Sequence, residues 1–86
     1  MHYAIETPTN FGKLIKKIPR SDLLRVRDKI RDLAHDPRPH GVEKLDVNLY
    51  RIRQGNYRII YKIYDKKLLV LVLTVEHRRE VYRNLP

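Results

Sequence analysis

Residues 48–75 read NLYRIRQGNYRIIYKIYDKKLLVLVLTV, and the two-residue period of the apolar side chains in this stretch indicates a β-sheet. The turn signals are Gln54-Gly55-Asn56 and the Asp65-Lys66 step, and both are short enough to bring each strand back beside the previous one. We therefore expect an antiparallel meander. Its three strands are predicted at Asn48–Arg53, Tyr57–Tyr64 and Lys67–Val75.

The third of these strands contains an unbroken apolar run from Leu68 to Leu73. A strand without alternation has both faces at least partly covered, so we place it at the centre of the sheet. Two helices are enough to cover one face only. The segment from Glu76 to Pro86 is therefore expected to fold over part of the second face.

The chain before the meander predicts a strand and two helices. Tyr3–Glu6 alternates weakly and ends before Pro8, which favours a short first strand. Two amphipathic helices follow, separated by Pro19. The segment Asp36–Gly41, with its two prolines, then ends helical structure and leads into extended chain. The apolar stripes are Phe11, Leu14, Ile15 and Ile18 in the first helix, and Leu23, Val26, Ile30, Leu33 and Ala34 in the second.

These elements predict an α+β fold of order βααβββ. The sheet is expected to be small and antiparallel-rich, with an N-terminal helical hairpin packed on one face and a C-terminal tail over part of the other. With 86 residues and one continuous apolar pattern, the chain has room for a single core, so residues 1–86 are expected to form one domain.

The charge balance indicates an anionic partner. Nineteen Lys and Arg stand against ten Asp and Glu, a formal net charge of +9, which favours nucleic acid but also suits acidic proteins and membrane surfaces. The chain has no cysteine, which excludes disulfides and thiolate zinc sites, and the spacing of its four histidines does not suit a metal. We expect no metal and no cofactor. No export signal or membrane-spanning run is apparent, which predicts a cytoplasmic protein.

Alternation in the strands gathers basic side chains on one face. Arg51 and Arg53 point away from the apolar set of their strand, and Arg58 and Lys62 do the same in the next. Like charges placed together oppose folding unless an anion neutralises them, and the planar fork of arginine matches phosphate oxygens. We therefore predict a phosphate-binding face, with ordinary solvated strand residues as the alternative.

The segment Glu76-His77-Arg78-Arg79-Glu80-Val81-Tyr82 adds residues able to act in phosphoryl transfer. Cleavage of RNA by its own 2′-hydroxyl needs a proton acceptor, cations for the charged phosphorane, and an acid for the leaving 5′-oxygen. Basic side chains and one phenol can supply all three. Tyr82 can equally pack on the sheet or stack on a base, and His77 is similarly open between structural and catalytic roles.

Five stretches together give the chain a resemblance to the RelE branch of the RelE/ParE toxin superfamily of toxin–antitoxin systems, over nearly its whole length. They are Asp36-Pro37-Arg38-Pro39 after the helix, Gly41-Val42-Glu43-Lys44-Leu45, Leu49-Tyr50-Arg51-Ile52-Arg53, Gly55-Asn56-Tyr57-Arg58-Ile59-Ile60-Tyr61, and His77-Arg78-Arg79-Glu80-Val81-Tyr82. The resemblance implies a metal-independent mRNA endonuclease that cuts in the ribosomal A site and leaves a 2′,3′-cyclic phosphate, inhibiting translation. It also implies a cognate antitoxin on a separate acidic chain, through which alone operator DNA is bound.

By the same resemblance, Arg51 and Arg53 match catalytic basic positions and Arg58 matches the arginine that holds the phosphate. Arg78 or Arg79 matches the proposed acid or charge stabiliser, and Tyr82 matches a terminal tyrosine. The best-known members carry lysines where this chain has Arg51 and Arg53, and arginine is a poor proton acceptor. The general base is therefore open between Tyr82, His77 and a contribution from the ribosome, with a site that mainly stabilises charge as the further alternative.

Two alternatives share this fold. A ParE-like inhibitor of DNA gyrase needs no ribonuclease residues, and the joint presence of Arg51, Arg53, Arg58 and Tyr82 argues against it. A catalytically silent RNA-binding module would contact phosphate through the same arginines without promoting cleavage.

Overall fold

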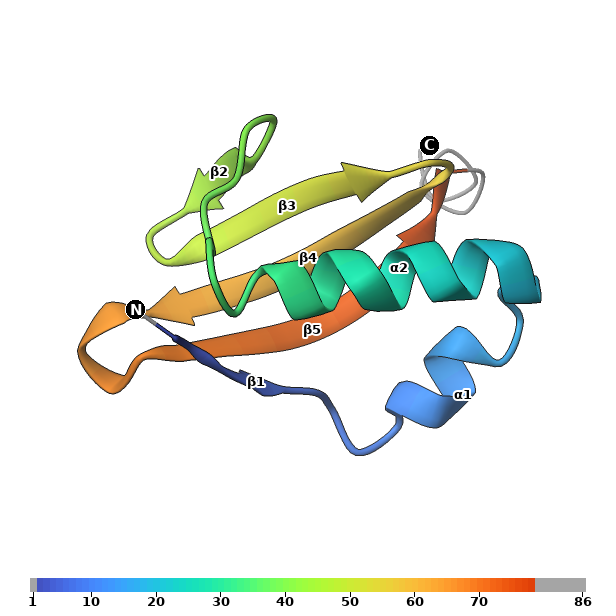
Figure 1. Cartoon of the computed structure of the whole chain (residues 1–86), viewed down its shortest axis with the longest axis horizontal. Helices are drawn as coiled ribbons and strands as arrows, with labels where there is room; N and C mark the ends of the chain where they lie inside the picture. Colours follow the sequence, from blue (N-terminus) through green and yellow to red (C-terminus); the bar gives the residue numbers. More distant parts are fainter. Residues whose placement is uncertain (1, 79–86) are drawn as a thin grey trace.

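The computed structural model describes residues 2–78, which form two α-helices and a five-stranded sheet (Figure 1). The expected α+β class is confirmed, with one strand more than the sequence predicts. The elements are β1 (Ala4–Glu6), α1 (Phe11–Ile15), α2 (Arg20–Asp32), β2 (Glu43–Asp46), β3 (Leu49–Gln54), β4 (Tyr57–Tyr64), a 3₁₀ turn (Asp65–Lys67) and β5 (Leu69–His77).

The strands lie in the order β1-β5-β4-β3-β2. The meander from β2 to β5 is antiparallel, and β1 adds to it as a parallel neighbour of β5. The middle strand is therefore β4, and β5, which the apolar run places at the centre, lies one position toward the edge. No helix within residues 2–78 is long and apolar enough to cross a membrane.

The core lies between the helices and one face of the sheet, and Figure 1 shows both helices on that same side. Burial along β4 alternates residue by residue, and Ile59, Tyr61 and Ile63 are completely buried. From α2 the stripe of Val26 and Ile30 packs onto them. The two-residue period therefore assigns the faces of β4 correctly.

Several element boundaries differ from the prediction, most of them by one or two residues. The helix α1 ends at Ile15 rather than Ile18, because the chain tightens into a turn in which the Ile18 nitrogen donates to the Ile15 oxygen just before Pro19. β5 begins at Leu69, since Leu68 takes a left-handed conformation with φ of 49°. The sequence predicts only extended chain where β2 forms, because the four residues of β2 are all exposed and carry no apolar stripe. The tail expected over the second face is Glu76–Pro86; Glu76 and His77 instead continue β5, and residues 79–86 lie outside the described part.

Candidate functional site

The predicted basic residues meet on the face of the sheet opposite the helices, which we call the open face. Arg53 of β3 and Arg58 of β4 are direct cross-strand partners, and Arg51 pairs with Ile60 one step along the same face. Lys62 lies further along it, opposite Leu49 and Leu71. The structure thus brings Arg51, Arg53 and Arg58 together at the end of the sheet where β3 turns into β4.

The Arg58 side chain has no hydrogen bond or ion pair to any other residue between 2 and 78. Its partner Arg53 donates from Nε to the backbone oxygen of Gly55 at 3.0 Å, which leaves the terminal nitrogens of that guanidinium for other contacts. Two like charges directly opposite each other destabilise a sheet. A bound anion would relieve this repulsion, and a phosphate offers oxygens to both forks at once.

A carboxylate that sequence reasoning missed also belongs to this face. Glu43 of β2 is the cross-strand partner of Arg51, and Arg51 Nη2 donates to Glu43 Oε2 at 2.6 Å. The Glu43 side chain stays 62% exposed, so it is accessible to a ligand lying on the arginines. The Arg51 Nε is buried and has no hydrogen-bond partner within the described residues. The open face therefore holds a proton acceptor beside its cations, which arginines alone cannot provide.

The residues from β5 are divided between the two faces. A bulge at Leu73 shifts the register between β4 and β5, so that Glu76 lies opposite Arg58, while His77 lies opposite Tyr57 on the helical side. There the His77 ring packs edge-on against Tyr57, with 5.0 Å between ring centroids. The structure does not bring His77 together with the arginines of the open face.

Arg78 follows β5 and is exposed. Its backbone nitrogen donates to the Asn56 oxygen at 2.8 Å, which fixes this residue beside the turn between β3 and β4. Arg78 is thus held at the same end of the sheet as Arg53 and Arg58. Arg79 and Tyr82, the other predicted residues of this segment, lie outside the described residues.

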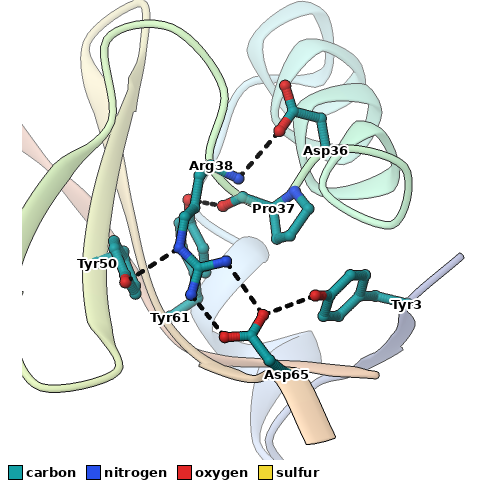
Figure 2. A network of polar contacts seen from close by, with 7 residues as sticks. All are labelled: Tyr3, Asp36, Pro37, Arg38, Tyr50, Tyr61 and Asp65. Atoms are coloured by element: carbon teal, nitrogen blue, oxygen red, sulfur yellow. Dashed lines mark hydrogen bonds and ion pairs between the residues drawn. The ribbon is translucent and has the colours of Figure 1, made fainter. Parts of the chain in front are cut away.

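A second polar cluster lies at the opposite end of the sheet (Figure 2). Arg38 donates to both carboxylate oxygens of Asp65, at 3.1 and 2.8 Å, and its Nε donates to the Tyr50 hydroxyl at 3.2 Å. The Tyr3 hydroxyl donates to the same carboxylate at 2.6 Å. This cluster joins the loop after α2, the chain just before β1 and the turn after β4. We call it the Arg38 clasp, and its position argues for a structural role.

The neighbouring Tyr61 hydroxyl extends the Arg38 clasp into the core. It donates to the Pro37 oxygen at 2.8 Å, and burial raises the pKa of Tyr61. A buried hydroxyl without a partner would be costly, so this bond holds the loop at Pro37, whose backbone has an acceptor but no donor. The contacts of Pro37 and Arg38 therefore give the Asp36-Pro37-Arg38-Pro39 stretch a structural role.

The Arg38 clasp predicts a pH dependence of stability. Its hydrogen bonds from Arg38, and then from Tyr3, lower the pKa of Asp65 from 3.8 to about 2. Because the folded pKa is lowered, ionised Asp65 stabilises the fold above its ordinary pKa, and this contribution is lost as the pH falls toward 2. In urea unfolding, the stability difference between wild type and Asp65→Asn should be constant above about pH 4 and shrink below it.

The control for this prediction is Asp28→Asn. Asp28 makes only a 4.0 Å pair with Arg31, and both side chains are about 70% exposed. A pair of this kind contributes little, so its stability difference should stay small at every pH. A difference for Asp65→Asn that persists undiminished at pH 2 would contradict the assignment.

Comparison with known proteins defines the class. A family model described as the ParE toxin of the type II toxin–antitoxin system parDE matches residues 9–82. This match spans most of the sequence, so the chain belongs to that family of toxins. Its relatives carry RelE-type names, as the sequence motifs predict, and the RelE-type resemblance is confirmed.

Toxin RelG of Mycobacterium tuberculosis is 29% identical over 86 residues, covering 96% of this chain and 99% of RelG. The toxin–antitoxin complex RelBE2 of the same organism matches with a TM-score of 0.77 and 27% identity, over 91% of this chain and 100% of the solved one. The archaeal RelE–RelB complex of Pyrococcus horikoshii matches with a TM-score of 0.78 and 26% identity, over 91% and 97% of the two chains.

Proposed function

We propose that this toxin is a ribosome-dependent mRNA endonuclease that cuts in the A site and thereby inhibits translation in the cytoplasm. The observation that carries the proposal is the guanidinium of Arg58, which has no partner among the described residues and lies directly opposite Arg53 on the open face. Two guanidinium groups in this arrangement match the oxygens of one phosphodiester. The RelE-type resemblance implies that this phosphodiester belongs to a message.

The proposed reaction is attack by the 2′-hydroxyl on the adjacent phosphorus. A bond forms between the 2′-oxygen and phosphorus, and the bond from phosphorus to the 5′-oxygen breaks. The proton of the 2′-hydroxyl passes to a base, and the leaving 5′-oxygen takes a proton from an acid. Arg53 and Arg58 stabilise the charge that develops on the phosphorane oxygens, so the step needs no metal.

Glu43 is the proposed proton acceptor. It is the carboxylate on the open face that forms an ion pair with an arginine of the predicted site, and carboxylates act as general bases where arginines do not. In this scheme Arg51 orients Glu43 instead of contacting the phosphate. By resemblance, the acid or charge stabiliser is Arg78 or Arg79.

The proposed partner is a cognate antitoxin on a separate, acidic chain. Two solved relatives are complexes of a RelE toxin with its RelB antitoxin. The net charge of +9 favours an acidic segment over the open face, where it would cover the arginines. Operator DNA would then be bound through the antitoxin.

The function is tested by adding the purified protein to translating ribosomes and, separately, to DNA gyrase. Cleaved message with normal gyrase supercoiling is the expected result. Intact message with inhibited gyrase would instead establish the alternative of a ParE-like gyrase inhibitor. RNA binding without cleavage or gyrase inhibition would identify a silent RNA-binding module.

A further inference from the structure

The open face continues beyond the arginines along β4. Burial alternates through this strand, so Tyr64 lies on the same face as Arg58, Ile60 and Lys62. At the far end of this row is a hollow of about 400 Å³ at the turn after β4. It is lined by Asn48, Tyr64, Asp65, Lys66 and Lys67. We call it the Tyr64 hollow.

The Tyr64 hollow combines an aromatic ring with positive charge. The Lys67 ammonium lies 5.7 Å from the centroid of the Tyr64 ring, and Lys66 is exposed beside it. Asp65 is the one carboxylate in the lining, and both of its oxygens accept hydrogen bonds from Arg38. The Arg38 clasp thus neutralises the Asp65 carboxylate, which would otherwise repel an anion. The positive charges of Lys66 and Lys67 therefore dominate the electrostatic potential in the hollow.

We propose that the Tyr64 hollow binds a base of single-stranded RNA whose reacting phosphate lies at Arg58, an inference that rests on the proposed function. Arg58 and Tyr64 are six residues apart on one strand, roughly 20 Å at about 3.3 Å per residue. The base stacks on the Tyr64 ring, and Lys66 and Lys67 contact the neighbouring phosphates. Lys62, midway along the row, contacts the connecting backbone.

The aromatic ring favours RNA over an acidic peptide as the occupant. Single-stranded nucleic acid is bound by basic tracks that carry aromatic platforms, because every base has a flat face to stack. An acidic peptide needs the lysines but not the ring. The contact between Lys67 and Tyr64 is a weak one at an exposed position, so Lys67 can move from the ring to a phosphate when a base enters.

Binding is measured by fluorescence anisotropy on the full chain, with labelled 2′-O-methyl oligonucleotides of increasing length that cannot be cut. Affinity should rise with length and then level off once the oligonucleotide spans from Arg58 to Tyr64. Tyr64→Ala should remove the last gain in affinity, roughly tenfold, as expected for loss of one stacked base. Tyr64→Phe keeps the ring and should bind like wild type.

The lysines are tested through salt. The double variant Lys66→Ala with Lys67→Ala should lower the slope of log affinity against log salt by about 0.7 for each phosphate that the lysines no longer neutralise. The matched control is Arg27→Ala with Arg31→Ala on α2, which removes two charges from the other side of the molecule and should change the slope much less. Circular dichroism checks that each variant is folded.

Equal affinity and equal length dependence for wild type and Tyr64→Ala would overturn the proposal. The proposal would also be overturned if Tyr64→Ala weakened the binding of an acidic peptide but not the binding of RNA. The hollow would then be a protein-binding site. The assay contains no ribosome and no cleavage. A chain that fails to cut message but binds RNA through Tyr64 would therefore refute the proposed function and leave this site intact.

Discussion

Replacing Arg58 with alanine is expected to slow RNA cleavage by roughly 100- to 1000-fold, the effect of removing one preorganised donor from a transition-state charge. The Arg58 side chain makes no hydrogen bond or ion pair within residues 2–78, so its truncation breaks no polar contact of the described fold. The loss should appear in the rate of message cleavage on translating ribosomes. The melting temperature should not fall.

Two further variants show what the Arg58 position requires. Arg58→Lys keeps the charge but not the planar fork, so it should recover only part of the rate. Arg25→Ala removes an exposed arginine from α2 and should cut message normally. If Arg58→Ala cuts as fast as wild type, or unfolds, Arg58 is not the phosphate ligand that we propose.

Replacing Glu43 with glutamine should slow cleavage by roughly 100- to 10,000-fold, the range for loss of a general base. The amide keeps the size of the side chain and a hydrogen-bond acceptor for Arg51, but it cannot take a proton. Because the change removes a negative charge from a phosphate site, RNA should bind as well as before or better. The effect should therefore fall on kcat and leave KM unchanged or lower.

Lys44→Ala on the same strand is the control for Glu43, since its side chain lies on the other face of β2 and is exposed. Arg51→Ala should give a smaller loss than Glu43→Gln, because it frees the carboxylate without removing it. If the Glu43→Gln variant cuts message normally and the Tyr82→Phe variant does not cut it, the general base is Tyr82 and not Glu43.

The sequence predicts the arginine face well because the side-chain period of a strand does not depend on distant contacts. Arg51, Arg53 and Arg58 alternate with residues that are apolar and buried, and a short turn sets their register. Local pattern alone is enough to place these three charges on one face.

The positions of Glu43 and His77 depend on tertiary structure. Glu43 reaches the site only because β2 pairs with β3, and that short, exposed strand has no apolar period of its own. His77 shares a face with Leu71 and Leu73 by simple counting, but the bulge at Leu73 reverses the alternation and turns His77 toward Tyr57. A one-residue bulge leaves no clear mark in a run of leucine and valine.

The Arg38 clasp was also beyond sequence reasoning. Arg38 and Asp65 are 27 positions apart, and Tyr3 and Asp65 are 62 apart. A motif can indicate that Arg38 matters, but its partners become apparent only when the loop after α2 is placed against the turn after β4.

The central claim is that arginines of the open face cut RNA by using its own 2′-hydroxyl, and the most direct measurement of it is the chemistry of the cut ends. Message treated with wild-type protein on translating ribosomes should carry a 2′,3′-cyclic phosphate on the upstream fragment and a 5′-hydroxyl on the downstream fragment. An upstream 3′-hydroxyl with a downstream 5′-phosphate would mean that water, not the 2′-hydroxyl, attacks the phosphorus, and would contradict the account.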